Sequence, residues 1–108
     1  MNLIDEELTR ERFDFMGPDL VQRLLDALTR DLHKWAERLF IAFDVGDDET
    51  IRNARHSIRG LSSNFGATPL HEMAETELTT PQKQAAFRSL RDATLDAIRE
   101  TAKGPGGS

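Results

Sequence analysis

The sequence predicts an all-α protein, arranged as an antiparallel up-down four-helix bundle with a short leading N-terminal helix. Apolar residues recur every three or four positions along nearly the whole chain, which is the spacing of amphipathic helices. Strand patterns are missing, since β-branched residues are few, tyrosine is absent and no run alternates polar with apolar. Loops between the helical segments are short, which makes successive helices antiparallel neighbours. The alternative is an open helical hairpin that needs a partner to fold.

The first two expected helices are separated by a break at Gly17-Pro18-Asp19. A short helix is expected over residues 4–13 and a long one over 18–43, with proline in the first turn, where its missing N–H costs nothing. The long helix carries one apolar stripe with steps of three and four: Leu20, Leu24, Leu28, Leu32, Trp35, Leu39 and Phe43. This stripe predicts the face that packs into the bundle.

A third helix is expected after the turn DVGDDET, with Asp47 or Asp48 as its N-cap. It should run to Phe65 and end at Gly66, because a glycine after a helix readily adopts the left-handed conformation. The third helix is therefore expected to run from about residue 48 to residue 65, in the middle of the sequence.

Two proline-containing pairs predict the starts of the last two helices. Thr68-Pro69 opens a short helix to residue 78, and Thr80-Pro81 opens a final helix to residue 102. In both pairs the threonine is the expected N-cap.

Composition and charge limit the classes of function. The 108 residues fit a single domain, 1–102, followed by a flexible glycine-rich tail, 103–108. The absence of cysteine excludes disulfides and thiolate metal sites and predicts a reducing, cytoplasmic compartment. The longest apolar run, LFIAF, is too short to cross a membrane, and a net charge of -5 argues against nucleic acid as a partner. We expect a cytoplasmic monomer.

The third helix has an unusual exposed face around His56. On a wheel of about 100° per residue, one sector collects the apolar residues Ile51, Ala54, Ile58, Leu61 and Phe65. His56 lies about 180° from the centre of that sector and should point away from the core. Its neighbours at i−4, i+3, i+4 and i+7 are Arg52, Arg59, Gly60 and Ser63.

This face has the chemistry of an anion site. We expect Arg52, Arg55 and Arg59 to have no acidic i±4 partner on that face, since no acid occurs between residues 49 and 72. Gly60 costs about 1 kcal/mol against alanine in mid-helix, and it would let another molecule approach the histidine closely. An imidazole beside guanidiniums can act as a nucleophile toward phosphorus, with Arg59 best placed to stabilise a phosphoryl group. The alternative is a solvated helix face with one stray histidine.

The segment HSIRGLSSNFGA, residues 56–67, resembles the signature of histidine-containing phosphotransfer (HPt) domains. That signature reads roughly His-x-Leu-Lys-Gly, then small residues, then Gly-Ala. The resemblance extends over about residues 3–102, and LHEMAETEL is similar to the short helix that follows the signature.

The resemblance implies a free-standing phosphorelay carrier of two-component signalling. His56 would accept a phosphoryl group through Nε2 from an aspartyl phosphate on a receiver domain, or return it. Arg59 would stabilise the phosphoryl group, and Gly66 would close the helix. The residues implied to bind the partner are Arg52, Arg55, Gly60 and Ser63. The implied partners are response-regulator receiver domains and a hybrid histidine kinase; the receiver brings Mg²⁺, and the chain needs no cofactor of its own.

Three positions depart from the family pattern. Arg59 stands in place of lysine, Ile58 in place of leucine, and Arg55 in place of the small residue that usually precedes the histidine. The sequence contains neither a glycine-rich ATP-binding segment nor the strand-then-aspartate pattern of a receiver. The resemblance therefore implies a phosphocarrier rather than an autonomous kinase. The alternative is an HPt-like module that binds or sequesters a receiver or regulator without being phosphorylated.

The two other histidines are expected on the surface. His33 lies on the flank of the long helix, away from its apolar stripe. His71 and Glu75 are spaced i, i+4, but two ligands without a third make a weak metal site, so no metal is expected.

Overall fold

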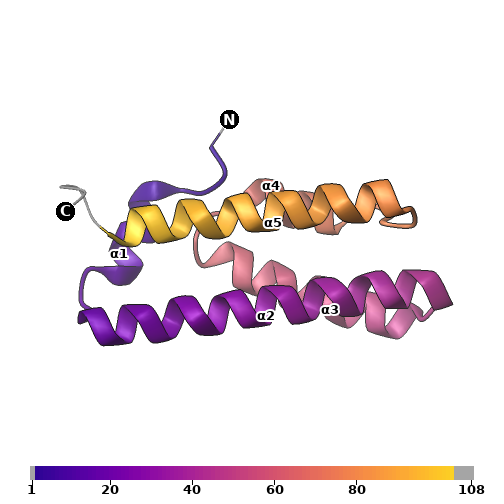
Figure 1. Ribbon diagram of the computed structural model, residues 1–108, viewed down its shortest axis with the longest axis horizontal. Coiled ribbons are helices and arrows are strands. Elements are labelled where there is room, and N and C mark those ends of the chain that lie inside the picture. Colours follow the sequence, from indigo (N-terminus) through magenta and orange to yellow (C-terminus); the bar gives the residue numbers. More distant parts are fainter. Residues whose placement is uncertain (1, 104–108) are drawn as a thin grey trace.

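The computed structural model describes residues 2–103, and these form five helices and no strand (Figure 1). The helices are α1 (Glu6–Phe13), α2 (Pro18–Val45), α3 (Asp48–Ser63), α4 (Thr68–Ala74) and α5 (Pro81–Ala102). The prediction of an all-helical chain is confirmed.

The two longest helices, α2 and α5, lie side by side and run in opposite directions, as the sequence colours in Figure 1 show. α3 packs along α2, α4 packs against both α3 and α5, and α1 packs against α5. α4 has only 7 residues, and a non-helical segment, 75–80, continues from it to α5. One side of the molecule is therefore built from a short helix and an irregular segment.

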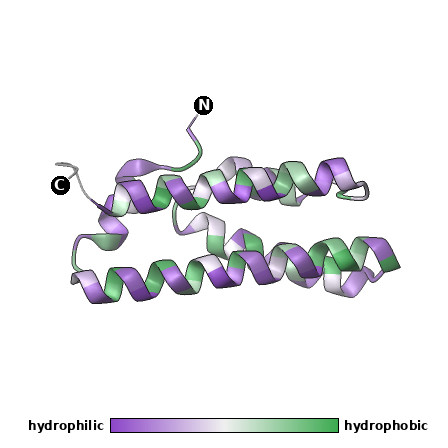
Figure 2. Ribbon diagram, viewed as in Figure 1, coloured by the Kyte–Doolittle hydropathy of each residue, from purple (hydrophilic) through white to green (hydrophobic). Residues whose placement is uncertain are grey.

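The core is formed by the apolar faces of all five helices and of the segments that join them. Figure 2 shows hydrophobic and hydrophilic bands alternating along the long helices, as amphipathic helices require. The largest fully buried apolar side chains are Leu32, Leu39, Ile58, Leu70, Leu78, Phe87 and Ile98. Leu20 departs from the predicted stripe and is 53% exposed, because it lies in the first turn of α2, before the part that α3 covers.

The starts of α3 and α5 lie where the capping residues of the sequence place them. The Thr80 side chain accepts a hydrogen bond from the Lys83 N–H at 3.2 Å, and α5 begins at the following proline. Asp47 caps α3 by accepting from the Thr50 N–H at 3.1 Å. Hydrogen bonds from Thr50 also lower the pKa of the Asp47 carboxyl below its usual value.

The ends of the first two helices differ slightly from expectation. α1 begins at Glu6 rather than residue 4, because Asp5 is its N-cap and accepts from the Leu8 N–H at 3.0 Å. α2 continues to Val45 rather than residue 43, and Gly46 ends it in the left-handed conformation with a φ of 74°.

The ends of α3 and α4 differ more. α3 ends at Ser63 rather than Phe65, although Gly66 does adopt a φ of 59°. α4 ends at Ala74 rather than residue 78, and its N-cap is Ala67 instead of the threonine that follows. The carbonyls of Ala74, Glu75 and Thr76, at and just after the end of α4, accept hydrogen bonds from a side chain of α3 that is described below.

A tight junction joins α1 to the end of α3. The Asp5 N–H donates to the Phe65 carbonyl at 2.9 Å, and the buried Thr9 hydroxyl donates to the Asp5 carbonyl at 2.8 Å. Phe13 stacks on Phe65 with ring centroids 5.9 Å apart. A Cβ on Gly66 would lie 2.5 Å from the Asp5 Cβ, so this position requires glycine for both its backbone angle and its close approach.

The last helix ends at Ala102, where the predicted domain ends. Of the predicted tail, 103–108, only Lys103 is described, and the rest lies outside the described residues. Within residues 2–103 no helix combines the length and the apolar character needed to cross a membrane.

Candidate functional site

His56 lies near the middle of α3, with its side chain exposed. The opposite face of α3 is buried, as the wheel predicts: Ile51, Ala54 and Ile58 lie in the core. Leu61 is only half-buried. Burial of that apolar face directs the histidine outward, and no further constraint is needed to expose it.

A cavity of about 420 Å³ opens beside His56. Its lining consists of Asp48, Ile51, Arg52, Arg55, His56, Arg59 and Glu75. The histidine and the three arginines therefore meet at one surface. Two carboxylates also line it, which corrects the expectation of an acid-free face: Glu75 comes from the end of α4, and Asp48 from the first turn of α3.

Arg59 is held by two side chains from the α4 region. Its Nη2 donates to Glu75 Oε1 at 2.8 Å, and its Nε donates to His71 Nε2 at 3.1 Å. His71 Nε2 also lies 3.5 Å from Glu75 Oε1. The hydrogen bond from Arg59, aided by the charges of the nearby arginines and partly offset by burial, lowers the pKa of the Glu75 carboxyl. Glu75 is therefore a carboxylate at neutral pH.

Arg55 lines the same cavity, but its guanidinium bonds to the backbone at the end of α4. Its Nε donates to the Ala74 carbonyl at 2.8 Å, and its Nη2 donates to the Thr76 carbonyl at 2.8 Å and to that of Glu75 at 3.4 Å. The guanidinium carbon lies 5.2 Å from the ring centroid of Phe43 on α2. Arg55, on α3, thus contacts both the end of α4 and the Phe43 ring of α2. The sequence assigns Arg55 to partner binding and gives no sign of this internal contact.

Gly60 leaves an open surface one turn beyond His56. A Cβ placed there would meet no heavy atom within 4 Å, so packing among the described residues does not require glycine. Ser63 is exposed and donates its hydroxyl hydrogen to the Gly60 carbonyl at 3.1 Å. Arg52 is exposed on the same cavity. Arg52, Gly60 and Ser63, three of the predicted partner-binding residues, are therefore exposed on the helix that carries His56.

A family model for the Hpt domain matches residues 9–102. The chain belongs to the Hpt domain family. Membership implies histidine phosphotransfer in phosphorelay signalling, and Hpt domains in general interact with receiver domains and kinases. Comparisons with curated proteins and with solved structures give no match.

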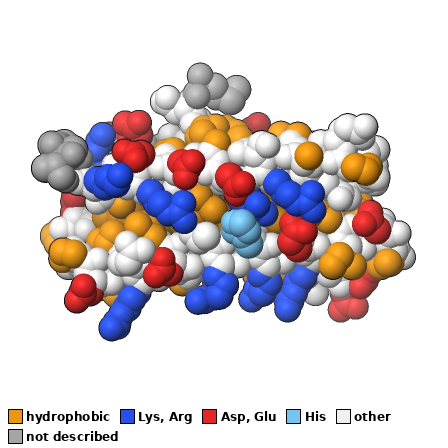
Figure 3. Space-filling view, viewed as in Figure 1, with side chains coloured by type: hydrophobic (Ala, Val, Ile, Leu, Met, Phe, Trp, Pro, Cys, Tyr) orange, Lys and Arg blue, Asp and Glu red, His pale blue; other side chains and the backbone are white. Residues whose placement is uncertain are grey.

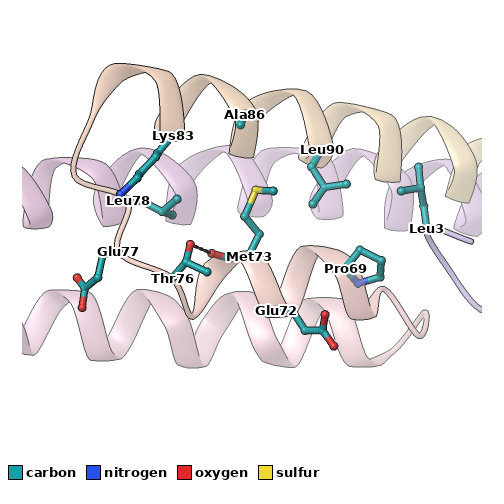
Figure 4. A pocket seen from close by; sticks show the side chains of 10 residues that line it. All are labelled: Leu3, Pro69, Glu72, Met73, Thr76, Glu77, Leu78, Lys83, Ala86 and Leu90. Carbon is teal, nitrogen blue, oxygen red and sulfur yellow. Dashed lines mark hydrogen bonds between the residues drawn. The ribbon is translucent and has the colours of Figure 1, made fainter. Parts of the chain in front are cut away.

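The Hpt domain has a larger cavity, of about 560 Å³, between α4 and α5. Figure 4 shows Met73 of α4 and Leu90 of α5 pointing toward each other there, with Leu78 and Leu3 nearby. Its lining contains no histidine and no arginine. It therefore lacks the imidazole and guanidinium pair found at His56, and the candidate phosphotransfer site is the smaller cavity at His56.

The face of the Hpt domain formed by α2 and α5 carries interleaved acidic and basic side chains (Figure 3). Arg88 donates two hydrogen bonds of 3.0 Å to the Glu37 carboxylate, and these lower the pKa of Glu37. His33 is exposed, with Nε2 3.8 Å from Asp92 Oδ1. Because Arg88 and Arg91 are paired with Glu37 and Asp92 beside His33, the surroundings of this histidine lack the excess positive charge that would attract an anion. Across residues 2–103 no group of three or more His, Cys, Asp and Glu is placed to hold a metal ion.

Proposed function

We propose that this Hpt domain is a phosphorelay carrier that exchanges a phosphoryl group between His56 and the aspartyl phosphate of receiver domains. The observation that supports this most is the exposure of His56 beside Arg59 in an open cavity, in a chain of the Hpt family. As predicted from the sequence, α2 to α5 would form an antiparallel four-helix bundle that presents this face, with α1 as its leading helix.

The proposed transfer needs only a lone pair on the histidine. Nε2 attacks phosphorus, the P–O bond of the aspartyl phosphate breaks, and its electron pair stays on the receiver carboxylate. The proton on Nδ1 remains there, so the phosphorylated ring carries the positive charge and no proton has to move. Arg59 would then stabilise the charge on the phosphoryl oxygens.

The surface around His56 supports docking of a receiver. Gly60 leaves room for a partner backbone near the imidazole, and Arg52 and Ser63 are exposed to contact it. The proposal assigns Mg²⁺ to the receiver and no cofactor to this chain. Its partners would be response-regulator receivers and a hybrid histidine kinase, and it would act as a cytoplasmic monomer.

Phosphotransfer profiling tests the proposal. Receiver domains charged on aspartate are mixed with the chain, and label on the chain is measured over time. We expect rapid transfer from at least one receiver, in a form that is labile to acid and stable to base. Transfer that persists in His56→Gln would overturn the proposal.

One observation favours the second candidate, a module that binds a receiver without being phosphorylated. The Arg59 guanidinium is already engaged by Glu75 and His71. This candidate predicts receiver binding that survives His56→Ala and no phosphohistidine with any donor. Stoichiometric phosphohistidine on the wild-type chain would eliminate it.

A further inference from the structure

We propose that Glu75 is a positioning residue that competes with the phosphoryl group for Arg59 and so weakens the affinity of the site for phosphate. This inference rests on the proposed function, because it concerns the state of His56 before and after phosphorylation. It assigns a role to the Glu75 carboxylate, which follows α4, whereas His56 lies on α3.

The contacts of Arg59 carry the argument. A guanidinium has five N–H groups, and Arg59 uses the edge formed by Nε and Nη2 for His71 and Glu75. That edge presents two parallel donors, the arrangement that also suits a phosphoryl group. While His56 is unphosphorylated, the donor pair best shaped for a phosphoryl group is therefore occupied.

Phosphorylation of His56 introduces a second anion that can bind Arg59 in place of Glu75. A phosphoryl group brings negative charge and three strong acceptor oxygens, so it can accept hydrogen bonds from both Nε and Nη2 of Arg59 in place of Glu75 and His71. Glu75 lines the same cavity as His56, and its negative charge opposes the incoming group. The side chains of Arg59 and Glu75 are 57% and 39% exposed, so solvent weakens their pair and the guanidinium can be released.

The same helix offers a matched control. Glu72 is exposed on α4 and lines the cavity between α4 and α5 instead of the cavity at His56 (Figure 4). Glu72→Gln and Glu75→Gln therefore make the same change in net charge, the first at the cavity between α4 and α5 and the second at the cavity beside His56. Glutamine keeps the size of glutamate, so neither variant should disturb the core.

The test is a ³¹P NMR titration of the phosphorylated chain without any receiver. Phosphoramidate charges histidine directly: its P–N bond breaks, ammonia leaves, and a new P–N bond forms to the imidazole. The resonance of phosphorylated His56 is the one that His56→Gln removes. Its titration midpoint reports the charge around the phosphoryl group, because nearby positive charge favours the dianion and lowers the midpoint.

We expect Glu75→Gln to lower this midpoint by about 0.3–0.7 pH units, roughly a two- to five-fold change in proton affinity, from the strength of exposed ion pairs. Glu72→Gln should shift it by less than half as much. In an Arg59→Ala background the effect of Glu75→Gln should fall to less than half, because Glu75 acts through Arg59.

An unchanged midpoint in Glu75→Gln, an equal shift in Glu72→Gln, or an undiminished shift in the Arg59→Ala background would each overturn this role for Glu75. Failure of every receiver to transfer would overturn the proposed function instead, and the titration would still report on Glu75.

Discussion

Arg55→Ala should destabilise the fold, although Arg55 lies one residue before the exposed histidine. The substitution removes two hydrogen bonds of 2.8 Å from a charged donor to the carbonyls of Ala74 and Thr76. It also removes the contact of the guanidinium with the Phe43 ring. The end of α4, which carries Glu75 into the cavity, would then lose its attachment to α3.

The magnitude follows from these contacts. Hydrogen bonds from a charged group contribute about 1.5–3 kcal/mol each, and partial exposure places these at the lower end. The cation–π contact adds about 0.5–1 kcal/mol, and regained side-chain freedom offsets up to about 2 kcal/mol. We expect the free energy of unfolding to fall by about 2 kcal/mol, which lowers Tm by about 8–16 °C for a domain of this size.

Urea unfolding followed by circular dichroism measures this change. Arg52→Ala is the matched control, because Arg52 lies one turn from Arg55 on the same helix and is exposed. It should change the free energy of unfolding by no more than about 0.5 kcal/mol. Arg55→Lys should fall between the two, since an ammonium cannot reproduce the planar fork. If Arg55→Ala costs no more than Arg52→Ala, the assignment of Arg55 to the end of α4 is refuted.

The remaining predictions concern three glycines and one ion pair. Gly66→Ala should lower the free energy of unfolding by about 2–3 kcal/mol. Gly46→Ala should lower it by only about 1 kcal/mol, because Gly46 also has a positive φ but has open space around it. Equal losses in urea unfolding would contradict the close approach at Gly66. Gly60→Ala should stabilise the helix by about 0.5–1 kcal/mol yet slow transfer from a receiver, and an unchanged initial rate would argue against its role in access. Arg88 lowers the pKa of Glu37 in the folded protein. The ion pair therefore stabilises the fold fully at pH values above the usual pKa of 4.5, and this stabilisation is lost as the pH falls through the lower pKa of the folded state. The stability difference between the wild type and Glu37→Gln should therefore be constant above about pH 5, no larger than about 1 kcal/mol, and shrink in acid; a difference that grows on acidification would contradict the ion pair.

Features of this fold that depend on neighbouring residues are predictable from the sequence. Thr80 caps α5, Asp47 caps α3, and Gly66 takes a left-handed conformation, because each depends on atoms within a few residues. The outward direction of His56 is equally local, since a helical wheel determines which face of α3 is apolar.

Features that depend on distant contacts were not predictable in this way. The expected end of α4 at residue 78 is wrong, because the Arg55 guanidinium binds the carbonyls where α4 ends, about 20 residues away in sequence, and Leu78 is buried in a non-helical segment. Glu75 enters the cavity for the same reason. The i, i+4 spacing of His71 and Glu75 was the available signal, but only the packing of α4 on α3 shows that Arg59 is their partner.

The central claim is that His56, and not another histidine, carries the phosphoryl group received from a receiver. The most direct measurement compares transfer from one charged receiver to three variants, His33→Gln, His56→Gln and His71→Gln. We expect base-stable label at wild-type level in His33→Gln, label that persists in His71→Gln with at most a several-fold slower rate, and none in His56→Gln. Label that remains in His56→Gln, or disappears only in one of the other two, would contradict the claim.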